Sequence, residues 1–514
     1  MSAPSSIMTY DFTDLIDNGQ PLRIQGHVSD EQRRRADLGQ FLTPTPVADL
    51  MASFLKVQFT DVRLLDAGAG TGSLIAAFVR RLCNRQRRPK SIIVVAYEVD
   101  SNLVPELRQT LDQCQTQCEL VGISFSATVS NEDFIGSVIP VVRNELFAPR
   151  LPPFNIAIAN PPYRKIRSDS PTRLLLRLAG IETSNLYTGF LALIIKLLDN
   201  GGELVAITPR SFCNGPYFKP FRREFLETMS VRRLHVYESR SKAFRKDSVL
   251  QENVIMHAIK DQLKPDHAVI SSSSGEPNGR VKRSKVPYCD VVLPNDPDEF
   301  IHFVVDNGQR KVKSIITKLS ASLLDLNLTV STGRVVDFRA KGYLRRQPAA
   351  DTVPLIYPTH FNGGFVSWPK ENSRKPNAIL STEETKELLI PAGTYVLVKR
   401  FTSKEERRRV VASIYDPERI QALLVGFENH LNYFHYQGHG LPMYLAKGLA
   451  AFLNSTILDE YFRQFSGHTQ VNATDLRALK YPSKESLEIL GEKIGKGEMS
   501  QKILDCIVSE TIFV

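Results

Sequence analysis

The feature that most constrains the fold is an alternation of strand-like and helix-like segments along the first half of the chain. Parallel strands need a long crossover connection, usually a helix, so this order is typical of a parallel sheet covered by helices. It predicts an α/β fold with a doubly wound, Rossmann-like sheet. The expected helices are 47–55, 73–81, a segment after Asp100, and 186–198; the expected strands are 62–66, 92–97, 122–128, the run ending at 160, 204–208, 234–238 and 254–259.

The chain is expected to form more than one domain, because 514 residues exceed what a single hydrophobic core usually supports. Periodicity is lost over 261–300, and the stretch SSSSGEPNG in that interval has the composition of a linker. We therefore predict a first domain at 1–265, a boundary region at 266–300 and a separate mixed α+β domain at 301–514. The last of these carries two helical patterns, at about 441–452 and 457–465.

A glycine-rich turn follows the first strand in LLDAGAGTGSL, residues 64–74. Asp66 ends the strand, and Gly68 and Gly70 allow a tight turn whose backbone a ligand can approach closely. No Lys-Ser or Lys-Thr pair follows the last glycine, so the turn is not a Walker phosphate loop. The turn therefore indicates a ligand other than a nucleoside triphosphate.

Acidic residues also stand at the ends of the next two strands. Glu98 follows the strand in VVAYEVD, where a carboxylate can bind both hydroxyls of a ribose. Asp133 and Phe134 follow the third strand, in NEDFI. Asp133 can accept a hydrogen bond from an adenine amino group, and Phe134 can pack against the adenine ring. A pyrophosphate would be repelled by Asp66, whereas an adenosine with a cationic tail suits all three acids. The pattern predicts an S-adenosylmethionine site.

The fourth strand ends in a motif that suits chemistry on an amine. In NIAIANPPYRKIR, residues 155–167, the apolar run stops at Asn160, Pro161, Pro162 and Tyr163. Prolines end a strand because they cannot donate to its ladder, and they hold the backbone rigid. An amine conjugated to a ring is a poor nucleophile, and donating to the Asn160 side-chain oxygen and the Pro161 carbonyl would free its lone pair. Tyr163 supplies a ring on which a planar base can stack.

This ordered set of motifs resembles the gamma class of N6-adenine DNA methyltransferases of type II restriction-modification systems. LGQFLTPTPVADLM (38–51) matches the N-terminal cofactor motif of that class, and the resemblance covers about 31–260. It implies catalysis by the motif Asn160 to Tyr163, with Phe244 and Tyr163 stacking on the two faces of a flipped adenine. The cofactor-binding residues that it implies are Thr43, Asp66, Gly68, Gly70, Glu98, Asp133, Phe134 and Asn160.

The second half is similar to the recognition half of type II modification methylases of the PstI and BsuBI kind. The stretches LVKRFTSKEERRRVVA (397–412) and FSGHTQVNATDLRALKYPS (465–483) carry this likeness. It implies double-stranded DNA as the substrate, adenine in CTGCAG as the target, and a cognate restriction endonuclease that acts on the same site. A base inside a duplex is out of reach, so the adenine must rotate out of the stack.

The charge of the chain suits a polyanionic partner. The formal net charge is +10 and the sequence pI about 9.2, with Lys and Arg in separate clusters. Arg164, Lys165 and Arg167 stand beside the catalytic motif and are candidates for contacts to DNA phosphates. A solvated loop would have the same composition, so both interpretations stay open.

Other features indicate a cytoplasmic protein without a metal site. No stretch approaches the ~20 apolar residues of a membrane span, and the N-terminus lacks the layout of a secretory signal. The six cysteines are scattered. Cys114 and Cys118 fit one helix face, but no second pair or histidine cluster completes a zinc site, so we expect reduced thiols.

Several alternatives share parts of this pattern. A cytosine-C5 methyltransferase is excluded because the chain has no Pro-Cys pair for the nucleophile. Cytosine-N4 enzymes usually carry Ser at the position of Asn160. A glutamine-N5 protein methyltransferase, an RNA guanine-N2 methyltransferase and a DNA-binding module with an inactive methyltransferase fold stay open. No Asp followed by Glu-x-Lys indicates a fused endonuclease.

Overall fold

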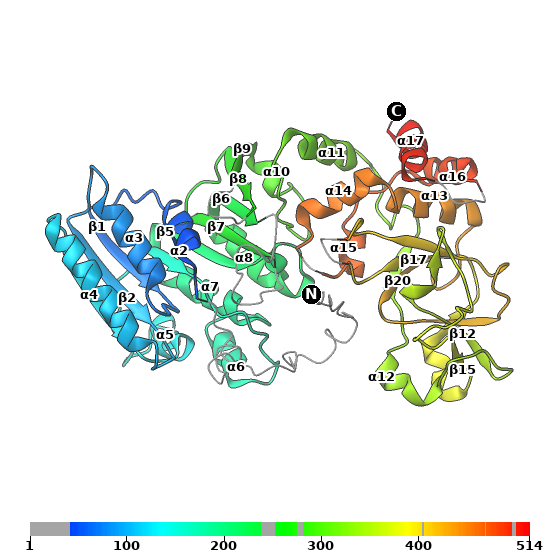
Figure 1. Ribbon diagram of the computed structural model, residues 1–514, viewed down its shortest axis with the longest axis horizontal. Helices are drawn as coiled ribbons and strands as arrows, with labels where there is room; N and C mark the ends of the chain where they lie inside the picture. The colour runs from blue at the N-terminus through cyan, green and yellow to red at the C-terminus, as the bar shows by residue number, and fades with distance from the viewer. Residues whose placement is uncertain are drawn as a thin grey trace, which may run out of the picture.

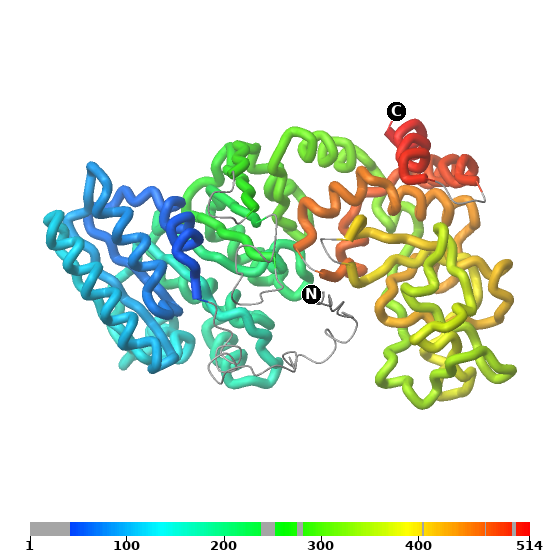
Figure 2. Tube along the Cα trace, in the orientation of Figure 1, coloured from blue at the N-terminus to red at the C-terminus, as the bar shows by residue number. Residues whose placement is uncertain are grey.

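The computed structural model describes residues 42–237, 252–274, 281–402, 406–467, 469–495 and 500–513. Figure 1 shows two parts side by side, an N-terminal part built on one large sheet and a C-terminal part with smaller sheets. The tube in Figure 2 shows residues of the C-terminal part (orange) returning to lie against the N-terminal part (green). The α/β sheet with a separate mixed C-terminal part confirms the predicted fold class.

The N-terminal sheet reverses its strand order next to the expected site. Among the described residues it has nine strands in the order β3-β2-β1-β4-β5-β7-β6-β8-β9. β1 pairs in parallel with β2 on one side and with β4 on the other, so the chain winds outward in both directions from this point. Ligands of doubly wound sheets bind beyond the carboxyl ends of the strands at such a reversal. The strands are β1 (Asp61–Asp66), β2 (Ser91–Tyr97), β3 (Ser124–Ser130), β4 (Phe154–Ala159), β5 (Leu198–Pro209), β6 (Met229–Tyr237), β7 (Asn253–Lys260), β8 (His267–Ser273) and β9 (Lys282–Pro287).

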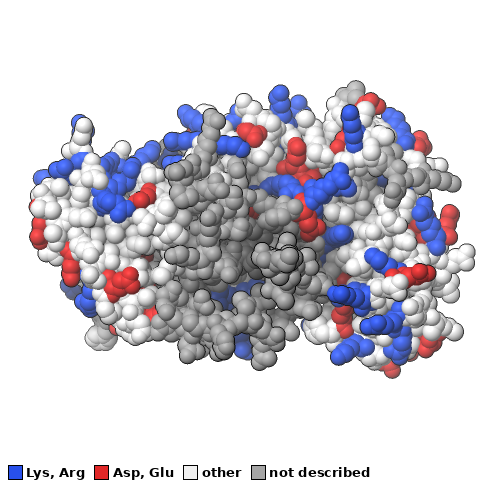
Figure 3. All heavy atoms as spheres, in the orientation of Figure 1, with Lys and Arg blue, Asp and Glu red and all other residues white. Residues whose placement is uncertain are grey.

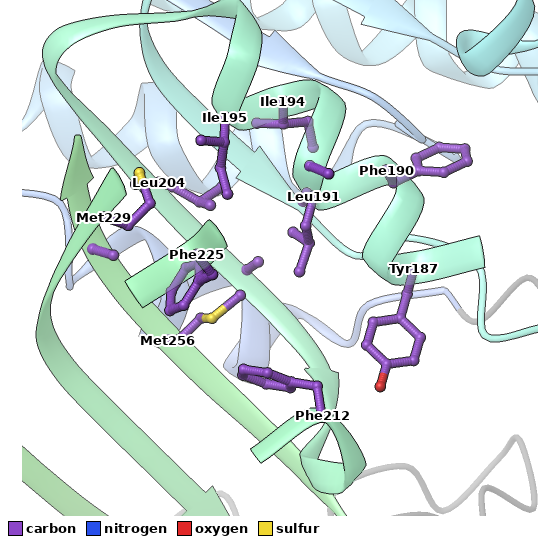
Figure 4. Packing of buried hydrophobic residues seen from close by; sticks show 14 of the residues in the cluster. Tyr187, Phe190, Leu191, Ile194, Ile195, Leu204, Phe212, Phe225, Met229 and Met256 are labelled. Carbon is purple, nitrogen blue, oxygen red and sulfur yellow. The ribbon is translucent and has the colours of Figure 1, made fainter. Parts of the chain in front are cut away.

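Helices cover both faces of this sheet and bury two hydrophobic cores. On one face lie α2 (Thr45–Ala52), α3 (Ser73–Cys83) and α4 (Val104–Leu120). On the other lie α5 (Phe134–Val142), α7 (Leu186–Leu197) and α8 (Lys219–Thr228). Figure 4 shows Leu191 and Ile195 of α7 pointing toward the strands, with Phe225 of α8 beside them. α7 is buried on nearly every side because it lies between the sheet and α5, α6 (Pro171–Leu178) and α8.

Two features of the sheet differ from the prediction. β7 runs antiparallel between β5 and β6, so the sheet is mixed rather than parallel throughout. The interval 266–300, predicted as a linker, contains β8 and β9, which extend the sheet beyond β6. That expectation was wrong because the serine-rich strand β8 buries Ser271, Ser272 and Ser273, and its low apolar content concealed a sheet strand.

The C-terminal part contains two sheets that face each other. The side chains of Tyr395, Tyr415 and Tyr433 from the six-stranded sheet pack against Ile356 and Phe427 of the five-stranded sheet. The strands are β10 (Thr329–Thr332), β20 (Leu431–His435), β17 (Tyr395–Lys399), β18 (Ala412–Tyr415), β14 (Phe365–Val366) and β13 (Phe361–Asn362) in the larger sheet, and β11 (Leu344–Arg345), β15 (Ala378–Leu380), β12 (Thr352–Ile356), β19 (Leu424–Phe427) and β16 (Leu389–Pro391) in the smaller.

Helices lie outside this pair of sheets. Most of them pack on the free face of the larger sheet, whereas α12 (Asp337–Ala340) packs on the free face of the smaller one. The helical predictions at 441–452 and 457–465 correspond to α13 and α14. The remaining helices are α10 (Tyr288–Val291), α11 (Asn307–Thr317), α13 (Met443–Leu453), α14 (Thr456–Phe465), α15 (Ala473–Arg477), α16 (Lys484–Lys493) and α17 (Gln501–Ile512), with short 3-10 turns at Arg210–Cys213, Pro216–Phe218, Lys341–Tyr343, Pro358–His360 and Glu383–Leu388.

No helix in the described ranges is both long and apolar enough to cross a lipid bilayer. No group of three or more His, Cys, Asp or Glu side chains in those ranges is arranged to hold a metal ion.

Candidate active site

A pocket of about 580 Å³, open to solvent at its mouth, lies at the carboxyl ends of β1, β2 and β4. This is the position at which the strand order reverses, where doubly wound sheets bind their ligands. Its wall joins residues that are far apart in the sequence. They are Leu42, Ala67, Gly68, Gly70, Glu98, Val99, Leu103, Glu132, Asp133, Phe134, Asn160, Pro162 and Phe190.

The glycine turn is held against Glu98. Gly70 has a φ of +56°, and its N–H donates to Glu98 Oε2 at 2.8 Å, while Oε1 of the same carboxylate accepts from Asp100 N–H at 2.7 Å. A left-handed φ favours glycine. A Cβ on Gly70 would also approach the Leu42 side chain to 3.3 Å. The lack of a side chain at Gly70 therefore lets Leu42, in the pocket wall, pack close to the backbone of the turn. Glu98 is only 3% exposed and is fixed in place by these two donors.

Asp66 lies beneath the turn rather than in the pocket wall. It is fully buried, Oδ1 is 3.4 Å from Gly68 N, and Oδ2 has no hydrogen-bond partner in the described part of the chain. Burial raises the pKa of Asp66 to about 7, and the charge of Glu98 adds to the rise while the Gly68 N–H opposes it. Asp66 therefore gains or loses its proton near neutral pH.

Asp133 and Phe134 stand where the chain enters α5. Asp133 caps this helix, since Oδ2 accepts from Gly136 N–H at 2.8 Å, and its side chain lines the pocket. The Phe134 ring is buried edge-on to Tyr97, with ring centroids 5.2 Å apart, and tilted on Phe190 at 5.1 Å. The two residues thus present an acid and an apolar wall side by side.

The Asn160 amide is held by two hydroxyl groups. Nδ2 donates to Thr43 Oγ1 at 3.0 Å, and Oδ1 accepts from the Tyr163 hydroxyl at 2.8 Å. The same hydroxyl is 3.1 Å from the Ile207 carbonyl oxygen. Asn160 lines the pocket with its amide held in this orientation. Pro162 also lines the pocket, so the motif faces the site.

Tyr163 is half-buried and is not one of the residues that line the pocket; it adjoins the site through its hydrogen bond to Asn160. Its ring packs edge-on against Tyr187, with centroids 6.2 Å apart, and burial raises its pKa far above the usual range. The hydroxyl therefore stays neutral and remains a donor to Asn160. Phe244, the other residue expected to stack on a base, lies outside the described residues.

The basic segment after the motif is exposed. Arg164, Lys165 and Arg167 all face solvent, and Arg167 lies 3.6 Å from Asp169 in a weak surface pair. Backbone hydrogen bonds from Ile166 and Leu186 pair this segment with the chain just before α7. The three side chains thus stand on a fixed backbone beside the pocket.

Several wall residues were not among the sequence candidates. Val99 is 52% exposed directly after Glu98, and Phe190 reaches the pocket from α7. An apolar residue following a strand-end acid would have signalled Val99. Phe190 gave no signal, because most of α7 is apolar and buried. Thr43, expected in the cofactor site, instead bonds to Asn160, and its neighbour Leu42 lines the pocket.

Comparison with curated proteins decides the family. The chain is 43% identical over 482 residues to the type II methyltransferase M.PstI from Providencia stuartii, covering 94% of each chain. It is also 43% identical over 488 residues to M.BsuBI from Bacillus subtilis, covering 93% of this chain and 95% of that one. The chain belongs to the type II methyltransferases. The resemblance noted in the sequence is thereby confirmed.

This methyltransferase also matches a family model and resembles several solved structures. The model described as Eco57I restriction-modification methylase matches residues 148–244, which include the Asn160 motif. Among solved structures, the type IIG restriction endonuclease BpuSI is 14% identical with a TM-score of 0.44, covering 94% of this chain and 64% of that one. A DrdV-DNA complex is 12% identical with a TM-score of 0.45, covering 90% and 57%.

Proposed function

We propose that this methyltransferase transfers a methyl group from S-adenosylmethionine to N6 of an adenine that has rotated out of a short duplex sequence. The single observation that carries the proposal is the position of the Asn160 amide, which lines an acid-lined pocket and is held there by hydrogen bonds to the hydroxyl groups of Thr43 and Tyr163. The proposed role is protection of that sequence from a cognate restriction endonuclease. The likeness of the second half to PstI-type and BsuBI-type enzymes supports CTGCAG as the sequence.

The residues of the pocket fit S-adenosylmethionine. Glu98, Glu132 and Asp133 give the wall a negative charge, which suits a cation and opposes a phosphate. Val99, Leu103 and Phe134 supply apolar surface for an adenine ring. When bound, S-adenosylmethionine supplies an electrophilic methyl group on a sulfonium. In this proposal Glu98 binds the ribose hydroxyls and Asp133 the adenine amino group.

The Asn160 motif would act on the target amine. Asn160 Oδ1 and the Pro161 carbonyl oxygen each accept one hydrogen bond from the target amine. These two hydrogen bonds make the amine nitrogen pyramidal and more nucleophilic. Thr43 accepts one N–H of the Asn160 amide, which in this proposal orients the amide oxygen toward the amine. The proline pair holds the carbonyl in place. Rotation of the base costs a few kcal/mol, which stacking on Tyr163 and Phe244 offsets.

The C-terminal part, residues 301–514 in the predicted division, is proposed to read the DNA sequence. Arg164, Lys165 and Arg167 are proposed to hold phosphates next to the flipped base, and their exposure beside the pocket supports this. The positive net charge of the chain supports a polyanionic substrate in the same way.

Single-molecule sequencing of DNA from cells that express the chain tests the proposal, with Asn160→Ala as the inactive control. N6-methyladenine at one short motif, absent with the variant, is the expected result. N4-methylcytosine would keep the cofactor and overturn the base. If no base is modified by a protein that binds S-adenosylmethionine in calorimetry, DNA is not the substrate, and RNA or protein should be tried instead.

A further inference from the structure

The C-terminal part carries a dense basic surface at α12 that the active site does not use. Figure 3 shows Lys and Arg side chains gathered on the lower region of the C-terminal part, where Figure 1 places α12 and its neighbouring strands. Between residues 334 and 375 the sequence has eight basic and three acidic side chains. We define the α12 surface as the exposed residues Phe338, Arg339, Lys341, Arg345, Arg346, Lys370 and Arg374.

Two clamps, one buried and one partly exposed, hold this surface together. The first is Asn377, which is 2% exposed: its Nδ2 donates to the carbonyl oxygens of Arg346 at 3.1 Å and Lys370 at 3.0 Å, and its Oδ1 accepts from Lys370 N–H. His360 Nε2 lies 2.9 Å from the same Oδ1. One buried amide therefore ties two separate basic segments side by side.

The second clamp is Asp337, the first residue of α12. Its Oδ1 accepts from the hydroxyl of buried Tyr357 at 2.7 Å, and its Oδ2 pairs with Lys375 Nζ at 3.0 Å. Asp337 is thus already paired with Lys375, and in the described part of the chain Arg339, Lys341 and Arg346 form no ion pair with a carboxylate. Positive charge is left facing solvent on a rigid support, the arrangement that a phosphate-binding surface requires.

The surface also presents an aromatic ring. Phe338 is 57% exposed, and the Arg339 guanidinium carbon lies 5.5 Å from its ring centroid. α12 lies on the side of the C-terminal part that faces α6 in Figure 1, and α6 follows the Asn160 motif along the chain. An exposed apolar ring amid cations is suited to a nucleic-acid groove, where the cations meet phosphates and the ring meets sugars or base edges.

We propose that the α12 surface is the element of the C-terminal part that docks on duplex DNA at the recognition sequence. This inference rests on the proposed function and goes beyond it by naming the residues. Arg339 and Arg346 contact phosphates, and Phe338 enters the groove and contributes to the choice of sequence.

The experiment measures binding of a fluorescent duplex carrying the motif that cells show methylated, and of a scrambled duplex, over a range of salt. The variants are the double substitution R339A/R346A and the single substitution Phe338→Ala. The control is K484A/K502A, which removes the same charge from exposed residues of α16 and α17. Thermal unfolding and calorimetric S-adenosylmethionine binding establish that each variant is folded, and methyl transfer is measured on the same duplex.

For R339A/R346A we expect a dissociation constant at least about tenfold higher, and a salt slope smaller by about two, because each lost phosphate contact removes about one counterion. Phe338→Ala should keep the slope and lower the preference for the motif by about tenfold. If R339A/R346A has the same dissociation constant for the duplex as the control while wild type methylates that duplex, the α12 surface is not the docking element and the proposed function stands. If wild type neither binds nor methylates duplex DNA, both fall.

Discussion

Thr43 accepts a hydrogen bond from the Asn160 amide and so fixes how that amide is oriented. An amide has a donor end and an acceptor end, and the Thr43 hydroxyl oxygen takes the donor at 3.0 Å. Thr43 is 9% exposed, so a water molecule has little room to replace its hydroxyl group as the hydrogen-bond acceptor. Since the proposed chemistry needs the acceptor end, Thr43 is a positioning residue for the reaction, without touching the target base itself.

Thr43→Val should lower kcat by about 10- to 100-fold, the usual cost of losing a partner that orients a functional side chain. The shape is preserved, so the KM for S-adenosylmethionine should change little. Steady-state methyl transfer to duplex DNA measures both constants. Thr43→Ser keeps the hydroxyl and should retain most of the activity; equal losses in both variants would contradict the positioning role.

Asn160→Ala removes the acceptor itself and should lower kcat by at least about 100-fold, the scale found when one preorganised hydrogen bond to a reacting group is deleted. Binding of S-adenosylmethionine, followed by calorimetry, should remain largely intact because the loss is at the amine. Near-normal turnover would contradict the proposed mechanism.

The pKa of Asp66 makes stability depend on pH. A value of about 7 in the folded chain lies above the ordinary value of 3.8, so the folded chain holds a proton that the unfolded chain releases. The stabilisation by this group is complete below pH 4 and is lost as the pH rises through 7. Asp66→Asn cannot ionise, so the free energy of unfolding of wild type relative to the variant should fall by up to about 4 kcal/mol over this window. Urea unfolding at pH 4.5, 6 and 8 measures it; a constant difference would show that Asp66 is ionised throughout.

At the scale of elements, α13 and α16 cross in unusually close contact. A Cβ on Gly448 would come within 1.8 Å of the Leu487 carbonyl oxygen, and one on Gly491 within 1.8 Å of the Tyr444 carbonyl oxygen. Each glycine thus admits the backbone of the other helix. Glycine usually weakens a helix interior, and here the close crossing is what requires it.

Gly448→Ala should destabilise the C-terminal part by about 3 kcal/mol or more, because the helices must separate to admit the methyl group. Thermal unfolding monitored by circular dichroism measures the loss. Gly495→Ala is the matched control, since nothing lies within 4 Å of a Cβ there. Equal melting temperatures for the two variants would show that the crossing relaxes at no cost.

The sequence predicted these elements unevenly. α7 and α14 lie within a few residues of their predicted ranges because apolar periodicity and end signals agree there. β8 was missed because its serines hydrogen-bond inside the sheet, for example Ser271 with His235 at 3.0 Å, so burial did not require apolar residues. The antiparallel direction of β7 also gave no signal in its own residues, because the direction of a strand depends on the segments that connect it to its neighbours.

At the scale of the molecule, a polar junction joins the two parts. Arg210, just after β5, pairs with Glu252 at 2.9 Å and donates to the carbonyl oxygens of Arg463 and Gln464. Nearby, Asn214 donates to Asp475 at 3.0 Å and accepts from Gly467 N–H at 3.1 Å. Burial raises the pKa of Asp475 to about 6. The junction fixes the C-terminal part relative to the strand that ends beside the active site.

Arg210→Met should lower the free energy of unfolding by about 3–5 kcal/mol, because it leaves the Glu252 carboxylate buried without its cation. Chemical denaturation measures the change. Arg80→Met removes a surface pair with Asp49, both about half exposed, and should cost at most about 1 kcal/mol. If the two variants are equally stable, the junction contributes no more than an exposed ion pair.

The candidate site was more predictable than the arrangement of the two parts. Asp66 ends a strand, while Glu98, Asp133 and Asn160 come shortly after one, and parallel strands place such residues at one edge of the sheet. The junction was not predicted, because Arg210 and Asp475 are far apart in the chain and each sits in an unremarkable local pattern. Contacts of that kind depend on the packing of whole parts and leave no periodic signal.

The junction also has a consequence for the order of synthesis. Every residue that lines the pocket precedes 191, whereas the C-terminal partners of Arg210 and Asn214 lie between 463 and 475, near the end of the chain. The ribosome therefore delivers the pocket residues and the whole N-terminal sheet, whose last strand is β9, well before the segment that locks the C-terminal part in place. Premature termination in between would leave Arg210 and Asn214 without their partners in the C-terminal part, and the junction could not form.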